Sequence, residues 1–183
     1  MQNDILKILI SEEELAARIG ELARDIERDY KERLAPGDSL LMISILKGSV
    51  CFMADLMRAV RLPAMIDFMA VSSYGKGSVT TGAVRILKDL DTPVEGRHLL
   101  IVEDILDSGK TLSYIMGLLE TKKPASIRLC TLLDKPLRRQ VPVAADYTGF
   151  EVPDEFVVGY GLDYAERYRN LPYIGILKPE IYA

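Results

Sequence analysis

The sequence predicts an α/β fold with a mostly parallel central sheet that is flanked by helices. Three observations support this prediction: continuous apolar runs of strand length, amphipathic segments between those runs, and a chain of 183 residues. Uninterrupted apolar strands are typical of parallel sheets that are covered on both faces. The length suits a single domain over 1–183, with room for one small appended lobe.

The elements are predicted in chain order from apolar periodicity and from capping and breaking residues. A strand at 5–10 is followed by Ser11-Glu12-Glu13-Glu14, a capping box that predicts a helix start. Apolar residues then recur at spacings of three and four up to Leu34, and Pro36-Gly37 ends that helix. Further strands are predicted at 40–45, 64–70, 98–102, 125–132, 156–160 and 174–177, and further helices at 49–60 and 111–121. Ligands of such sheets bind beyond the carboxyl ends of the strands, here at the loops that begin at Lys47, Glu103, Asp134 and Asp163.

Composition and charge exclude several classes of partner. Lys and Arg number 23 and Asp and Glu number 27, so the formal charge is −4 at pH 7. Nucleic acids and anionic membranes recruit clustered Lys and Arg, so neither is an expected partner. The chain starts without a basic leader and has no apolar run near the roughly 18 residues of a membrane span, so we expect a cytoplasmic protein. Cys51 and Cys130 lie in apolar segments and are expected to be reduced, and a single histidine excludes metal sites with two imidazoles.

The segment 98–112 is the most informative part of the chain because it combines a strand, a turn and a helix start. Asp107-Ser108-Gly109-Lys110-Thr111 places small residues and free backbone N–H groups at a helix N-terminus, which favours a phosphate dianion. A Walker A motif would need glycine at position 104, which is Asp. Glu103 and Asp104 can accept hydrogen bonds from sugar hydroxyls or hold Mg²⁺. We therefore predict a ribose 5-phosphate site, with a solvated acidic turn as the alternative.

Residues 102–111, Val-Glu-Asp-Ile-Leu-Asp-Ser-Gly-Lys-Thr, resemble the phosphoribosyl pyrophosphate (PRPP) signature of type I phosphoribosyltransferases. The Glu-Asp start and the Lys after Gly resemble the hypoxanthine-guanine branch of that family more than the adenine branch. Further matches cover nearly all of the chain, at 46–48, 73–74, 133–135, 156–163 and Arg169. The resemblance implies the fold of that family, in which the N- and C-terminal segments form a small hood lobe.

The resemblance assigns the acidic residues to chemistry on the ribose and the purine. Asp107 corresponds to the general base that faces N7 of the purine. It acts when N9 bonds to the sugar carbon, because the N7 proton then becomes acidic. Glu103 and Asp104 orient the ribose diol, and with Asp163 they bind one or two Mg²⁺ ions. The 5-phosphate is bound by Asp107, Ser108, Gly109, Lys110 and Thr111.

Other matched residues are assigned to pyrophosphate and to a lid. The pyrophosphate-binding residues are Lys47, Gly48 and Arg169. The peptide bond between Leu46 and Lys47 is expected to be cis. Ser73 and Tyr74 belong to a lid that excludes water while the sugar carbon has oxocarbenium character. From the residues alone, Lys47 and Gly48 form a polar turn and Arg169 lies in a charged surface helix. The segment with Ser73 and Tyr74 is then a hairpin connection.

The purine site is assigned to a strand end and to an apolar segment further along the chain. Its residues are Lys135, Phe156, Val157 and Asp163. Lys135 donates to O6 of a 6-oxopurine, and a site built for that hydrogen bond can reject adenine by roughly 10⁴-fold. The ring of Phe156 stacks on the base. From the residues alone, Lys135 is a solvated strand end and Phe156 fills a core.

The function implied by the resemblance is purine salvage. It is the Mg²⁺-dependent transfer of the 5-phosphoribosyl group from PRPP to N9 of hypoxanthine or guanine by a homodimer or homotetramer, with IMP or GMP and pyrophosphate as products. Three alternatives are a transferase that prefers xanthine or adenine, an RNA-binding regulator that senses PRPP, and a Walker-type kinase. Lys135 and the segment at Phe156 argue against adenine, the net charge argues against RNA, and Asp104 argues against the kinase, whereas xanthine stays open. Asp134 and Gly161 depart from the family pattern beside the predicted purine pocket.

Overall fold

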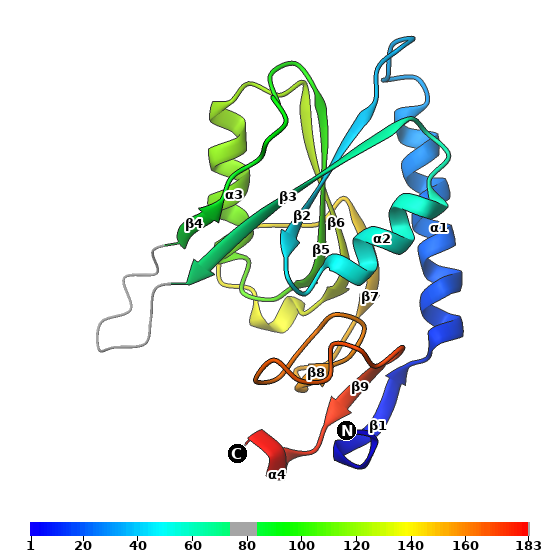
Figure 1. Ribbon diagram of the computed structural model, residues 1–183, viewed down its shortest axis with the longest axis vertical. Helices are drawn as coiled ribbons and strands as arrows, with labels where there is room; N and C mark the ends of the chain where they lie inside the picture. The colour runs from blue at the N-terminus through cyan, green and yellow to red at the C-terminus, as the bar shows by residue number, and fades with distance from the viewer. Residues whose placement is uncertain (74–83, 183) are drawn as a thin grey trace.

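The computed structural model describes residues 1–73 and 84–182. They form two sheets, one of six strands in the order β4-β3-β2-β5-β6-β7 and one of three strands in the order β1-β9-β8 (Figure 1). With η for a 3₁₀ helix, the elements are η1 Gln2–Asp4, β1 Ile5–Ile10, α1 Glu12–Tyr30, β2 Leu40–Leu46, α2 Val50–Ala59, β3 Ala64–Ser73, β4 Val84–Lys88, β5 His98–Leu106, α3 Lys110–Thr121, β6 Ser126–Asp134, η2 Pro136–Arg138, β7 Tyr147–Glu151, β8 Val157–Val158, β9 Ile174–Leu177 and α4 Pro179–Tyr182. None of the helices in this part of the chain has the length and hydropathy of a membrane span.

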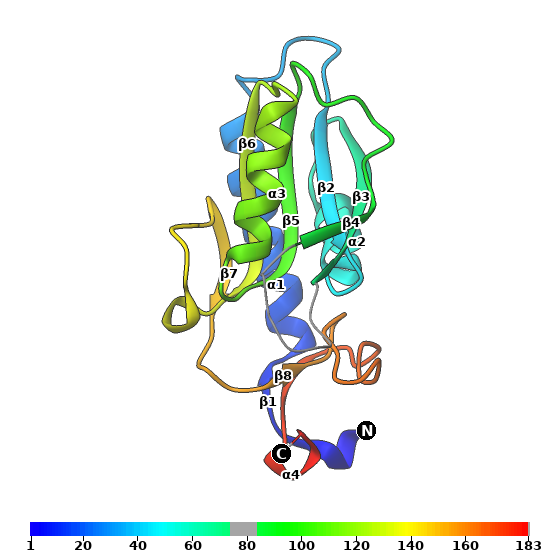
Figure 2. The same ribbon diagram turned by 90° about the vertical axis from the view of Figure 1, so that its left-hand side faces the viewer.

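The large sheet is parallel except at one edge. Strand β2 pairs in parallel with β3 and β5, and the parallel pairing continues from β5 to β6 and from β6 to β7. Strand β4 lies antiparallel to β3 at the edge. Helices α1 and α2 cover one face of this sheet and α3 covers the other (Figure 2). The α/β class with a mostly parallel, helix-flanked sheet is therefore confirmed.

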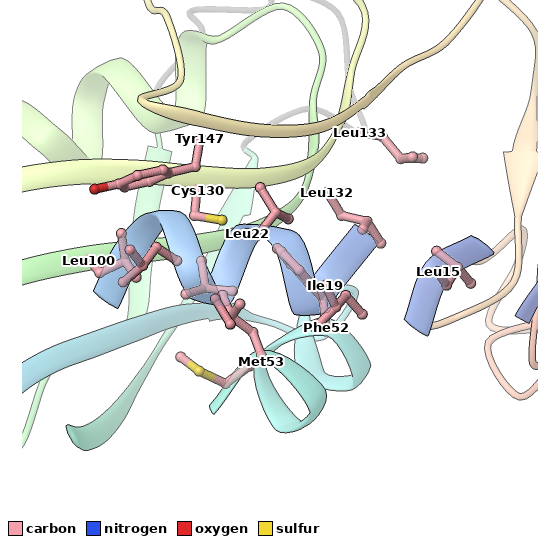
Figure 3. Packing of buried hydrophobic residues seen from close by; sticks show 14 of the residues in the cluster. Leu15, Ile19, Leu22, Phe52, Met53, Leu100, Cys130, Leu132, Leu133 and Tyr147 are labelled. Atoms are coloured by element: carbon pink, nitrogen blue, oxygen red, sulfur yellow. The ribbon is translucent and has the colours of Figure 1, made fainter. Parts of the chain in front are cut away.

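Successive residues of the central strands contribute to two apolar clusters, one on each face of the large sheet. In β5, Leu100 and Val102 belong to the cluster beneath α1 and α2, whereas Leu99 and Ile101 belong to the cluster beneath α3. This alternation follows from the pleat, which points successive side chains to opposite faces. Figure 3 shows the first cluster, with labels on Leu15, Ile19, Leu22, Phe52, Met53, Leu100, Cys130, Leu132, Leu133 and Tyr147. Because both faces are filled, the strands are held rigidly and their carboxyl ends can support a precise site.

The small antiparallel sheet is built from both ends of the chain and forms the hood that the resemblance implies. Strand β9 pairs with β1 on one side and with β8 on the other. A separate cluster of Val158, Tyr168, Leu171 and Leu177 packs beneath it. The hydroxyl of Tyr168 donates to Asp4 at 2.9 Å, which ties the two terminal segments together. The hood lies beyond the carboxyl ends of β2 and β5 (Figure 1).

Several predicted boundaries are confirmed and others are wrong. The strands at 5–10 and 174–177 have the predicted limits, and Ser11 and Glu14 form the predicted capping box before α1. Strand β5 continues to Leu106 instead of ending at 102, because its register with β6 runs on to Leu106 opposite Asp134. Glu103 and Asp104 therefore lie within a strand and not in the predicted loop.

Two strands were not predicted, and one predicted strand is much shorter. Strand β7 was missed because Gly149 at its centre interrupts the apolar pattern. The strand needs glycine there, since a Cβ would come within 2.4 Å of the Leu132 carbonyl oxygen. Strand β4, in which partly buried and exposed residues alternate, lies at the edge of the sheet. The predicted strand at 156–160 is reduced to β8 because the backbone has positive φ at Gly159 and Tyr160, 100° and 51°.

Candidate active site

A pocket opens where the ends of β2 and β5 meet the start of α3. Its lining includes Leu46, Gly48, Glu103, Asp104, Asp107, Ser108, Gly109 and Thr111. The fold thus brings the predicted turn after β2 next to the predicted ribose and phosphate segment. The two are separated by more than fifty residues in the sequence. This juxtaposition follows from the parallel pairing of β2 with β5.

Asp104 is a buried carboxyl group, and its neighbour Glu103 is partly buried. Asp104 is 9% exposed, and its Oδ1 accepts a hydrogen bond from the N–H of Ile105 at 2.8 Å. Burial raises the pKa of Asp104 to about 6, while burial and the neighbouring Asp104 raise the pKa of Glu103 well above its usual range. Glu103 Oε2 is buried with no hydrogen-bond partner among the described residues. A buried oxygen in that state is costly to the free protein and is satisfied when a ligand hydroxyl or cation reaches it.

The turn after β2 is packed closely between Asp104 and the segment after β8. The Leu46–Lys47 peptide bond is cis, as expected. A Cβ on Gly48 would lie 1.7 Å from Asp104 Oδ2, and a Cβ on Gly161 would lie 2.0 Å from the Gly48 carbonyl oxygen. Gly161 also has a φ of +102°, which favours glycine. The departure at 161 is therefore explained by close backbone packing against the turn.

The loop before α3 lines the pocket with Ser108 and Gly109. Helix α3 begins at Lys110, one residue earlier than predicted, and Gly109 has a φ of 80° at its N-cap. The first N–H groups of a helix have no intrahelical acceptor, so they are available to an anion. The segment that follows β6 is hydrogen-bonded to this loop. Lys135 N donates to the Leu106 carbonyl and Gln140 N to the Ser108 carbonyl, both at 3.0 Å.

Two arginines that the sequence analysis missed contact the loop at Asp107. Arg138 Nε donates to Asp107 Oδ1 at 2.7 Å, and its Nη1 donates to Asp154 Oδ1 at 3.1 Å. Arg139 donates to the backbone carbonyl of Asp107 at 2.6 Å and also forms an ion pair with Asp134. Asp134, which departs from the family pattern, is therefore paired with Arg139. In the sequence these residues are only a pair of arginines shortly after Lys135. Their spacing alone gives no sign that they contact a residue near 107.

The two cations predicted to bind pyrophosphate meet at a carboxylate that the sequence analysis also missed. Glu166 accepts from Lys47 Nζ at 3.1 Å and from Arg169 Nη2 at 3.3 Å. These hydrogen bonds, with Lys47 as the larger influence, lower the pKa of Glu166. Arg169 also donates to the Gly161 carbonyl and pairs with Asp163, both at 2.8 Å.

Residues of the predicted purine site meet at the chain just before β8. Lys135 is 8% exposed, its Nζ donates to the Glu155 carbonyl at 2.6 Å, and burial lowers its pKa. Phe156, the next residue along, is 36% exposed, whereas Val157 is buried in β8. The ammonium group predicted to read the purine therefore lies beside the residue predicted to stack on it.

The predicted lid is only partly visible. Ser73 is the last residue of β3, and Tyr74 lies outside the described residues.

Known proteins that resemble this chain are phosphoribosyltransferases. Residues 7–165 match the family model of the phosphoribosyl transferase domain. The chain is 54% identical over 182 residues to the hypoxanthine-guanine phosphoribosyltransferase of Bacillus subtilis, with 100% of this chain and 98% of that protein covered. It is 57% identical over 183 residues to the bifunctional protein TilS/HprT of Listeria monocytogenes, but it spans only 28% of that protein's length. A crystal structure of a hypoxanthine phosphoribosyltransferase from Staphylococcus aureus matches with a TM-score of 0.93 at 49% identity, over 100% of this chain and 97% of that one.

Proposed function

The chain belongs to the phosphoribosyltransferase family, and from that premise we propose that it transfers the 5-phosphoribosyl group from PRPP to N9 of hypoxanthine or guanine. The products are IMP or GMP and pyrophosphate, which makes the reaction a step of purine salvage. The strongest support is the buried Asp104 and the buried Oε2 of Glu103 beside a helix N-terminus in one pocket. A ribose 5-phosphate satisfies both halves of that pocket, because its diol reaches the carboxylates and its phosphate reaches the N–H groups.

Pyrophosphate is held by Lys47, Gly48 and Arg169 in this proposal. Glu166 bridges the two cations in the free protein, so it keeps Lys47 and Arg169 close together before substrate arrives. Pyrophosphate carries more negative charge than one carboxylate and forms bidentate contacts with a guanidinium group, so it replaces Glu166 as their partner.

The purine is recognised by Lys135, Phe156, Val157 and Asp163. The buried ammonium group of Lys135 donates to O6 of hypoxanthine or guanine, whereas the amino group of adenine would place one donor against another. Backbone groups at Val157 and Asp163 read the remaining edge of the base. The pairing of Lys135 with the Glu155 carbonyl keeps this ammonium group beside Phe156.

Asp107 acts on the purine during the transfer. The bond from the sugar carbon to pyrophosphate breaks with its electron pair leaving on pyrophosphate, and the same carbon forms a bond to N9. The purine then becomes cationic, and the Asp107 carboxylate accepts the N7 proton, which becomes acidic at that stage. Its Oδ2 is the oxygen that is not bonded to Arg138 in the free protein.

Mg²⁺ fits the carboxylates of this pocket as a cofactor, with one or two ions bound. Glu103 and Asp104 would hold one ion and Asp163 a second, and the unpartnered Glu103 Oε2 supports the first assignment. In residues 1–73 and 84–182, no three or more His, Cys, Asp or Glu side chains converge on one point, so PRPP oxygens and water would complete the coordination. When bound, the ion offsets the negative charge of pyrophosphate and orients the ribose hydroxyls.

We also propose a cytoplasmic homodimer or homotetramer. Both cysteines are free thiols, and Cys130 is buried in the core, as suits a reducing compartment. Sedimentation velocity of the purified protein tests the assembly.

The reaction is tested by pyrophosphate release with PRPP and, separately, hypoxanthine, guanine, xanthine and adenine, with and without Mg²⁺. Release with the first two bases and its loss in EDTA are expected. Preferential release with xanthine or adenine would change the assigned substrate. Binding of RNA without release for any base would instead support the regulator, and ATP hydrolysis without purine would support the kinase.

A further inference from the structure

We propose that Tyr182 is a positioning residue for the purine: it fixes the ring of Phe156 so that the other face of that ring can stack on the base. This inference rests on the proposed function, in which Phe156 contacts hypoxanthine or guanine. It adds a residue of α4 to a site that otherwise consists of the sheet ends and the hood loops.

The contact between the two rings is a parallel stack. Their centroids lie 4.8 Å apart and their planes differ by 25°. Tyr164 meets Phe156 at 5.4 Å with an interplanar angle of 89°, in an edge-to-face arrangement. Both separations fall in the range of favourable aromatic pairs. Phe156 precedes the two-residue strand β8 and is 36% exposed, and these two rings pack against it.

Tyr182 approaches Phe156 from the hood and not from the pocket. It packs against the hood cluster of Val158, Tyr168, Leu171 and Leu177. Both views of the ribbon place α4 at the end of the hood farthest from the large sheet (Figures 1 and 2). The backbone N–H of Leu177 donates to the Phe156 carbonyl at 2.8 Å, so the segment leading to α4 is tied to the same residue. The face of Phe156 opposite Tyr182 is therefore the one left for a base near Lys135.

A stacking partner gains affinity when its ring is already fixed, because the base does not have to restrict the ring's rotation on binding. Loss of Tyr182 should therefore weaken purine binding and leave PRPP binding unchanged, since Tyr182 does not line the pocket at β2, β5 and α3. From the usual strength of aromatic pairs, we expect an increase of about threefold to tenfold in the KM for the purine.

The experiment compares Tyr182→Leu with Tyr182→Phe and with Ile181→Ala, measuring kcat and the KM for hypoxanthine, guanine and PRPP, together with the thermal unfolding midpoint. Tyr182→Phe keeps the ring and should match the wild type. Tyr182→Leu should raise the KM of both purines and leave that of PRPP within about twofold. Ile181 packs on the same hood cluster, so Ile181→Ala is the control for simple loosening of the hood.

Three results would overturn the inference. Equal purine KM for Tyr182→Leu and Tyr182→Phe would show that the ring is not needed. Equal KM increases in Tyr182→Leu and Ile181→Ala at equal loss of unfolding midpoint would show a structural effect only. A lower purine KM in Tyr182→Leu would mean that Tyr182 occupies the face that the base uses.

A double variant separates this inference from the proposed function. If Tyr182 acts through Phe156, Phe156→Leu combined with Tyr182→Leu should bind purine no more weakly than Phe156→Leu alone. Additive losses would contradict the inference. A wild-type protein that releases no pyrophosphate with any base would refute the proposed function itself, whereas an active wild type with an unaffected Tyr182→Leu refutes only the role of Tyr182.

Discussion

Arg138 Nε lies 2.7 Å from Asp107 Oδ1, so the carboxylate proposed to act on purine N7 is already paired with an arginine in the free protein. Arg138 is itself held by Asp154 at 3.1 Å. The pairing leaves one carboxylate oxygen for the purine and fixes the plane of the carboxylate. Both side chains are about half exposed, so the pair contributes little to folding stability and its effect is expected on catalysis.

Asp107→Asn should lower kcat by about 10²- to 10⁴-fold, the usual contribution of a positioned acid or base, while the dissociation constant of PRPP changes little. Asparagine keeps the shape of the side chain but cannot accept the N7 proton. Steady-state turnover and equilibrium titration with PRPP give the two numbers. An unchanged kcat would remove Asp107 from the chemistry.

Arg138→Gln should lower kcat by less, about twofold to fivefold, because the carboxylate stays but loses the contact that fixes its orientation. Asp154→Asn is the matched control, since it removes the outer partner of Arg138 and leaves the Arg138–Asp107 contact in place. It should retain near wild-type kcat. If the Asp154 variant were as slow as the Arg138 variant, the effect would come from the surface charge and not from contact with Asp107.

Much of the fold was predictable because apolar strands and capping residues act locally. The capping box at Ser11 and the apolar run at 40–45 needed only neighbouring residues. The end of β5 was not predictable, because the charged pair Glu103 and Asp104 resembles a loop until the register with β6 is known. Sequence reasoning places acidic residues outside a sheet, whereas here the pairing with β6 keeps them inside it.

The candidate site was predictable where one continuous segment carries it. The loop at 107–111 and the turn at Lys47 match a pattern that can be read along the chain. Arg138 and Glu166 were missed because each reaches its partner only after folding, across 31 and 119 residues respectively. Gly161 was noticed but could not be explained until its contact with the Gly48 carbonyl was visible.

Lys135→Met should raise the KM for hypoxanthine and guanine by about 10- to 100-fold and leave the dissociation constant of PRPP nearly unaltered. Methionine retains most of the buried stem and removes the ammonium donor, so the O6 acceptor of the base is left unpaired. Discrimination against adenine should fall, because it depends on that donor. Kinetics with the three bases and PRPP titration test this, and an equal loss for purine and PRPP would count against base recognition.

Asp104→Asn should stabilise the free protein at pH 7.5 while greatly weakening PRPP binding and turnover. Burial raises the pKa of Asp104 from its usual 3.8 to about 6, so the folded state favours the protonated form. That preference stabilises the protein fully below pH about 4 and is lost as the pH rises through 6, where the buried carboxylate must ionise. A neutral amide avoids the ionisation, and we expect a gain of about 1–3 kcal/mol in the free energy of unfolding at pH 7.5. Urea unfolding of both proteins should show that gain at pH 7.5 and a much smaller difference at pH 4. A difference that is the same at both pH values would show that the desolvated charge of Asp104 is not its cause.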